Sequence, residues 1–124
     1  MRLQFIPPFK VEYVPGKEPL TVRCLREIEA EGLLEDIQWD LAPGNPGPAP
    51  DTREDMAAGL SHVLKLVREA CESRKYDALI LLGGLEPGLY AAKQIATQYG
   101  IPLVGGTSSQ VAFASILGNR YSII

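Results

Sequence analysis

Residues 78–88 read ALILLGGLEPG, and this stretch decides the fold of the chain. Its first five residues are all apolar, which is typical of a central parallel strand covered on both faces. Two glycines then end the strand, and Pro87 fits the first turn of a helix that runs to Gly100. The stretch therefore predicts a strand, a tight turn and a helix, which is the repeating unit of an α/β domain.

The same unit recurs on both sides of this stretch. Short apolar or alternating segments predict further strands at residues 3–6, 37–41, 101–104 and 121–124. Apolar residues at helical spacing predict helices over residues 20–32, 52–74, 87–100 and 107–117. Residues 42–50 are dense in proline and glycine, so we expect a loop there.

Consecutive strand-helix-strand units need right-handed crossovers, and this requirement sets the expected architecture. We expect a single α/β domain over residues 1–124, with a doubly wound parallel sheet of four or five strands in the order 2-1-3-4-5. This is a flavodoxin-like, three-layer arrangement. Residues 37–41 alternate between apolar and polar types and therefore predict an edge strand. Ligands of such sheets bind at the carboxyl ends of the strands, near the point where the winding reverses. The loops at that end begin at Pro7, Ala42, Gly83 and Gly105.

Composition narrows the range of partners. The 124-residue chain has a net charge of −3 with acidic and basic residues intermixed, so nucleic acid is not an expected partner. No apolar run approaches the roughly 20 residues that a membrane-spanning helix needs, so no membrane partner is expected. Cys24 and Cys71 fall on the apolar faces of helical patterns and lack metal-ligand spacing. Because the chain shows no signal peptide, we expect inert, reduced core thiols in a cytoplasmic protein.

The glycine-rich turn at residues 83–88 is the first candidate for chemistry. The amides at a helix start are free and the helix dipole adds positive potential, so such a turn can hold a carboxylate or a phosphate. A second glycine turn, at residues 105–109, is expected at the same edge of the sheet and adds hydroxyl groups. The candidate ligand-binding residues are Gly83, Gly84, Leu85, Glu86, Gly88, Gly105, Gly106, Thr107 and Ser108.

Both turns also have purely structural interpretations. The glycines could serve only to make tight turns, Glu86 could merely cap the helix that follows it, and Thr107 with Gln110 matches a capping box. Glu86 is the candidate catalytic base, although a carboxylate at a helix start is stabilised as the anion and is weakly basic. His62 falls off the apolar stripe of its helix and is expected to be solvated. The glycine spacing is not a dinucleotide fingerprint, and we expect no cofactor and no metal.

Three segments of the chain resemble the Asp/Glu/hydantoin racemases. They are YDALILL with EPGL at residues 76–82 and 86–89, IPLVG at residues 101–105, and LGNRYS at residues 117–122. The resemblance implies one lobe of a cofactor-free enzyme built from two similar α/β lobes, each of which supplies a cysteine. One thiolate removes a proton from a carbon next to a carboxyl group, and the other thiol returns one to the opposite face.

The chain departs from that family at the positions that carry its chemistry. Gly83 stands where the family has its first cysteine, and Glu86 stands where the family has an aspartate before Pro-Gly. The family's Asn-Pro-Asn-Thr turn, which helps to hold substrate, is PPFK at residues 7–10, and Pro8 therefore joins the candidate ligand-binding residues. The last helix lacks the family's usual glutamate. The chain also ends where the second lobe and its cysteine would begin.

We therefore expect a racemase-like domain that binds a small carboxylate or other small anion at its glycine-rich turns and has no racemase activity. One alternative is a cofactor-independent isomerase, racemase or lyase for a small carboxylic acid, with Glu86 replacing the thiol and the site completed across a homodimer. Another alternative is a structural or interaction domain. Because no helix follows Ile124 to cover the sheet, a homodimer or higher homo-oligomer is expected.

Overall fold

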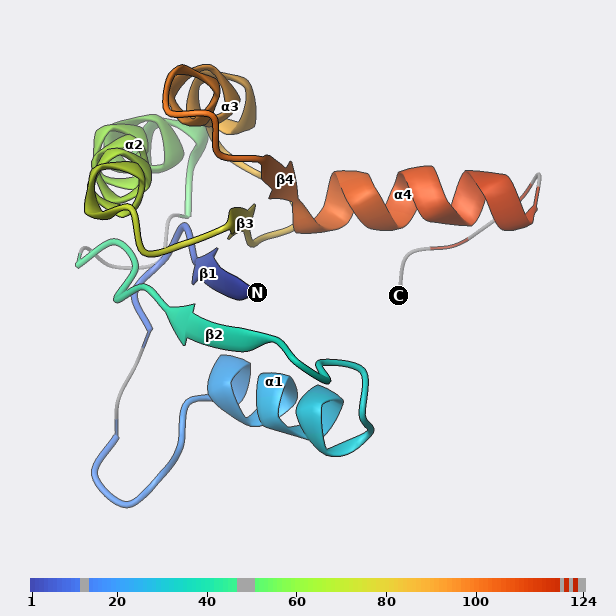
Figure 1. Cartoon of the computed structure of the whole chain (residues 1–124). Helices are drawn as coiled ribbons and strands as arrows, with labels where there is room; N and C mark the ends of the chain where they lie inside the picture. The colour runs from blue at the N-terminus through green and yellow to red at the C-terminus, as the bar shows by residue number, and fades with distance from the viewer. Residues whose placement is uncertain (12–13, 47–50, 119, 121, 123–124) are drawn as a thin grey trace.

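The computed structural model describes residues 1–11, 14–46, 51–118, 120 and 122. These residues form an α/β fold in which helices flank an all-parallel, four-stranded sheet (Figure 1). The elements are β1 (Arg2–Ile6), α1 (Leu20–Ala30), β2 (Gln38–Leu41), α2 (Arg53–Ser73), β3 (Ala78–Leu81), α3 (Leu89–Gln98), β4 (Leu103–Gly105) and α4 (Gly106–Leu117).

The strand order is β2-β1-β3-β4, which confirms the doubly wound parallel sheet and places β2 at its edge. The chain winds from β1 through α1 to β2 in one direction, and from β2 through α2 to β3 in the other. The winding therefore reverses between β1 and β3, the two neighbouring strands at the centre. The fifth strand was expected at residues 121–124, of which only Ser122 is described, and it is not in a strand; the end of the loop expected at residues 42–50 lies outside the described residues.

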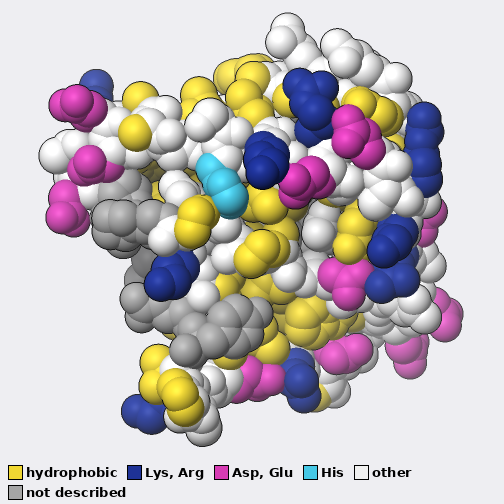
Figure 2. Space-filling view, turned by 90° about the vertical axis from the view of Figure 1, so that its left-hand side faces the viewer, with side chains coloured by type: hydrophobic (Ala, Val, Ile, Leu, Met, Phe, Trp, Pro, Cys, Tyr) yellow, Lys and Arg dark blue, Asp and Glu magenta, His cyan; other side chains and the backbone are white. Residues whose placement is uncertain are grey.

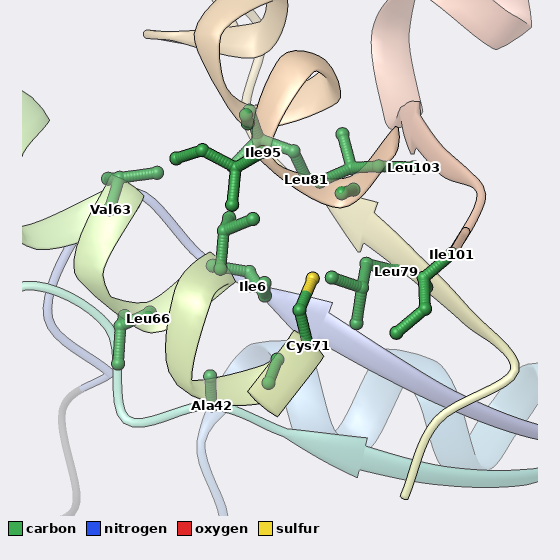
Figure 3. Packing of buried hydrophobic residues seen from close by; sticks show 14 of the residues in the cluster. Ile6, Ala42, Val63, Leu66, Cys71, Leu79, Leu81, Ile95, Ile101 and Leu103 are labelled. Carbon is green, nitrogen blue, oxygen red and sulfur yellow. The ribbon is translucent and has the colours of Figure 1, made fainter. Parts of the chain in front are cut away.

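The main core lies between the sheet and the helices α2 and α3. Ile6, Leu79 and Cys71 are among its fully buried side chains, and Figure 3 shows them pointing toward one another from β1, β3 and α2. At about 25 cal/mol per Å² of apolar surface, each such side chain contributes roughly 1.5–3 kcal/mol relative to an exposed one. This face therefore carries most of the apolar burial in the described chain.

The opposite face of the sheet has a smaller core beneath α1. Leu3 and Phe5 of β1 and Leu25 of α1 are its buried members, and Phe5 packs edge-on against Trp39 of β2 with ring centroids 6.5 Å apart. Helix α1 covers β3 and β4 less completely on this face: Ile80 of β3 is only half-buried, and Val104 of β4 is 42% exposed. Helix α1 thus buries the β1–β2 half of this face more completely than the β3–β4 half.

The last helix, α4, does not lie on either face. Figure 1 shows it extending outward from β4, and none of its residues is buried. An apolar helix of this kind is normally enclosed by other parts of a protein. The exposed fractions of Phe113, Ile116 and Leu117 are accordingly 63%, 79% and 73%.

Some expectations from sequence need correction. Cys71 is buried as expected, and desolvation raises the pKa of its thiol, but Cys24 is exposed because only Leu25 of α1 reaches the core. The fourth strand begins two residues later than expected, at Leu103, and α3 begins at Leu89 after the turn that contains Pro87. A glycine in the left-handed conformation, Gly88, is the N-cap of α3 and delays its start.

Candidate functional site

A cavity of about 500 Å³ opens where the winding of the sheet reverses. Pro8, just after β1, and Gly83, just after β3, both line it, and so does Thr21 in the first turn of α1. We call this space the switch-point cavity. Its position is the one at which doubly wound sheets bind their ligands, because the two crossovers leave the strand ends uncovered there.

The walls of the switch-point cavity are largely apolar, and its charges come from two lysines and one glutamate. Lys10 and Lys17 form no ion pair with any described residue, whereas the Oε1 atom of Glu18 lies 2.8 Å from the Nε atom of Arg26. The start of α1, at Leu20, adds its dipole and carries no acidic residue in its first turn. The electrostatic balance of the cavity therefore favours an anion.

The conformation and the surroundings of Gly83 both favour glycine at this position. Its φ angle is +102°, a conformation that side chains rarely adopt, and an added Cβ atom would lie 2.8 Å from the Cγ atom of Pro8. The glycine therefore permits both the turn and the close approach of the β1 loop. The contact joins Pro8 and Gly83, which the sequence analysis had selected for different reasons.

The two glycine-rich turns bind each other directly. The Glu86 carboxylate accepts a hydrogen bond from the Ser108 amide at 2.8 Å and another from the Ser108 hydroxyl at 3.3 Å, and the Thr107 hydroxyl donates to the Gly83 carbonyl at 3.2 Å. We call these contacts the Glu86 clasp. The prediction that Thr107 starts a capping box is wrong, because α4 begins one residue earlier, at Gly106, and its N-cap Gly105 has no side chain.

The clasp explains the glycine at the end of β4. A Cβ atom on Gly105 would collide with the Glu86 carboxylate and would lie 2.6 Å from the Ser108 hydroxyl oxygen. Glu86 thus does not cap the helix that follows it, since α3 has no side-chain cap. Its charge instead meets the positive end of α4, where a carboxylate is stabilised by the helix dipole.

His62 is half-buried rather than solvated. Its Nε2 atom lies 2.9 Å from the carbonyl oxygen of Gly44, so Nε2 carries the proton and donates. Gly44 in turn touches the β1 loop, since a Cβ atom there would collide with the carbonyl of Phe9. His62 therefore anchors the loop after β2 against the loop that walls the cavity.

No family model, curated protein or solved structure matches the chain. What the site does must therefore be argued from its own geometry. Within the described ranges no group of three or more His, Cys, Asp or Glu side chains could hold a metal ion, and no helix is long and apolar enough to cross a membrane.

The candidate residues from the sequence fall into three groups. Pro8 and Gly83 wall the cavity, while Glu86, Gly105, Thr107 and Ser108 make the clasp or pack against it. The others flank these groups: Gly84 and Leu85 are exposed, Gly106 is half-exposed at the start of α4, and Gly88 packs against Leu60. Sequence reasoning missed Lys10 and Lys17 as cavity residues, although Lys10 lies in the loop that begins at Pro7.

Proposed function

We propose that this domain binds a small carboxylate in the switch-point cavity and performs no chemistry on it. The observation that carries the proposal is the cavity itself, at the reversal of the winding and bounded by Pro8 and Gly83. Lys10, Lys17 and the start of α1 supply the positive potential, and the apolar walls suit the remainder of a small organic acid. A small organic acid matches both features, since its carboxylate suits the lysines and its carbon skeleton suits the apolar walls.

Kinship with the Asp/Glu/hydantoin racemases is part of this proposal. The parallel strand order β2-β1-β3-β4 and the YDALILL and EPGL segments on either side of the turn after β3 support it. Neither cysteine can act there, because Cys71 lies in the core and Cys24 is not among the residues of the cavity wall. We therefore propose a relative that retains binding and lacks the proton-transfer step.

The isomerase alternative has less support. It needs Glu86 to face a ligand as a base, whereas the Glu86 carboxylate accepts two hydrogen bonds from Ser108 in the clasp. Glu86 is also not among the residues that line the switch-point cavity, so its carboxylate does not face a ligand there. The homo-oligomer and the cytoplasmic location expected from the sequence stay predictions.

The test is calorimetric titration with small monocarboxylates and dicarboxylates, each paired with its uncharged amide. The Lys10→Gln/Lys17→Gln double variant should weaken carboxylate binding by at least about tenfold, which corresponds to two charge-assisted contacts of modest strength. The control is Lys75→Gln, which removes an exposed positive charge outside the cavity. Equal binding of acids and amides, or equal affinity of the double variant, would contradict the proposal.

A further inference from the structure

The switch-point cavity is larger than the smallest carboxylates need. Its volume of about 500 Å³ lies within the range of about 300–1,000 Å³ that is usual for pockets holding larger organic ligands. A methylene group takes up about as much room as a water molecule, which has about 30 Å³ in the liquid, so an acid of two or three carbons would leave most of the cavity to water. The volume therefore suits a ligand with a longer carbon skeleton.

The most enclosed residues of the cavity wall are apolar. Pro7, Pro8 and Val11 line the cavity and are buried. In the described part of the chain no polar or charged side chain is buried, so the enclosed wall offers no hidden partner to a charged group. This part of the cavity therefore accepts hydrocarbon and penalises a charge that would have to leave water.

Two large apolar side chains of the same wall face water. Val14 and Leu20 line the cavity, and both are exposed. A hydrocarbon chain that lies against them removes apolar surface from water on both the ligand and the protein, which favours binding. The wall thus continues its apolar character from the enclosed residues to the solvent-exposed ones.

The charges of the wall suit a single negative head group. Lys10 and Lys17 are its positive side chains within the described residues, and both are exposed. The carboxylate of Glu18 is already paired with Arg26, so the described wall has no unpaired carboxylate for an ammonium group. On the face shown in Figure 2, basic and acidic side chains are interspersed, so no broad field of one sign attracts a multiply charged ion there.

We propose that the ligand of the switch-point cavity is a medium-chain monocarboxylate without an amino group. This inference rests on the proposed function, because it takes carboxylate binding in the cavity as given and names the class of acid. The carboxylate lies at the exposed lysines, and the alkyl chain lies along Pro8, Val11 and Leu20. An acid of about eight carbons fills roughly half of the cavity. A second carboxylate at the far end of that chain would lose its water against a wall that has no further positive side chain among the described residues.

Calorimetric titration of the full chain with butyrate, hexanoate and octanoate, each below its critical micelle concentration, tests this class. Burial of one methylene group is worth about a factor of three to four in affinity, so octanoate should bind at least about thirtyfold more tightly than butyrate. Octanedioate and 2-aminooctanoate keep the chain and add a charge, so each should bind at least about tenfold more weakly than octanoate. Equal affinities along the series, or an octanedioate or 2-aminooctanoate that binds as tightly as octanoate, would overturn this inference and leave carboxylate binding standing. Octanamide that binds as tightly as octanoate, or no binding by any acid, would overturn both this inference and the proposed function.

A matched pair of variants locates the alkyl chain, because exposed apolar side chains elsewhere, such as those of α4, also attract hydrocarbon. Leu20→Asn replaces an apolar side chain of the cavity wall by a polar one of similar size, and should weaken octanoate binding by at least about threefold. Leu33→Asn is the control, since Leu33 is 68% exposed against 65% for Leu20 and does not line the cavity. Both side chains are exposed, so both variants should fold like the wild type, which circular dichroism checks. Octanoate binding that Leu20→Asn leaves unchanged, or that Leu33→Asn weakens equally, would overturn the placement of the chain in this cavity.

Discussion

The helices α2 and α4 are built in opposite ways. Helix α2 has 21 residues, starts with a capping box between Thr52 and Asp55 and buries five residues, including Val67 and Cys71. Helix α4 has 12 residues, starts at an N-cap glycine without a side chain and buries none. The first helix is stabilised by its own sequence and its own core, whereas the second is held at one end by the Glu86 clasp. The difference separates a helix that completes this fold from one that offers a surface.

The largest expected effect comes from placing the same charged residue in both helices. Val67→Lys puts an ammonium group into the main core without a partner, and we expect it to lower the free energy of unfolding by more than about 4 kcal/mol. Phe113→Lys on the exposed helix should change it by less than about 0.5 kcal/mol. Urea unfolding measures both. Similar losses in the two variants would show that α4 is packed within its own chain.

A smaller effect is expected from the helix start. Thr52→Ala removes the hydroxyl that accepts a hydrogen bond from the Asp55 amide at 3.1 Å, and should cost about 1 kcal/mol of stability. The control is Ser109→Ala in the first turn of α4, where the exposed side chain should matter by less than about 0.5 kcal/mol. If both alanine variants are equally stable, the capping box contributes nothing and the contrast between the two helices is weaker than described.

The smallest effect is a pH dependence at the same capping box. The side-chain and backbone hydrogen bonds of Thr52 hold the pKa of Asp55 below its ordinary value. Because the folded pKa is the lower one, Asp55 stabilises the fold above the unfolded pKa, and this contribution disappears as the pH falls through the folded value. Asp55→Asn should therefore flatten the acid side of the stability curve, measured by thermal unfolding between neutral and strongly acidic pH.

Glu54→Gln is the matched control for that measurement. It removes a carboxylate from the same first turn of α2 but leaves the hydrogen bonds between Thr52 and Asp55 in place. A stability curve that Asp55→Asn and Glu54→Gln alter to the same extent would attribute the acid sensitivity to the general charge of the helix start.

The sheet was predictable because its signals are local. The apolar run that begins at Ala78, the glycines after it and the alternation around Trp39 each identify an element and its place in the sheet. Helix boundaries were less predictable, since the left-handed Gly88 delays α3 and β4 continues to Gly105. These boundary shifts depend on backbone conformations that cannot be inferred from the types of the neighbouring residues.

The candidate site was predictable in its position and not in its contacts. Rules for doubly wound sheets lead to the ends of β1 and β3, and hence to Pro8 and Gly83. The pairing of Glu86 with Ser108 joins residues 22 positions apart and depends on how two turns meet in space. The pattern of Thr107 and Gln110 matched a capping box, but the Thr107 hydroxyl donates to Gly83 of the neighbouring turn instead. Tertiary contact thus overrode a local signal.

The Glu86 clasp also determines where an external anion can bind. The carboxylate is tethered beside the Ser108 amide, and a tethered group acts at an effective concentration on the order of millimolar or above. A dissolved acid at lower concentration therefore competes poorly for the start of α4. The Glu86 carboxylate thus occupies one of the two glycine turns, and the ligand proposed above would bind instead in the cavity between β1 and β3.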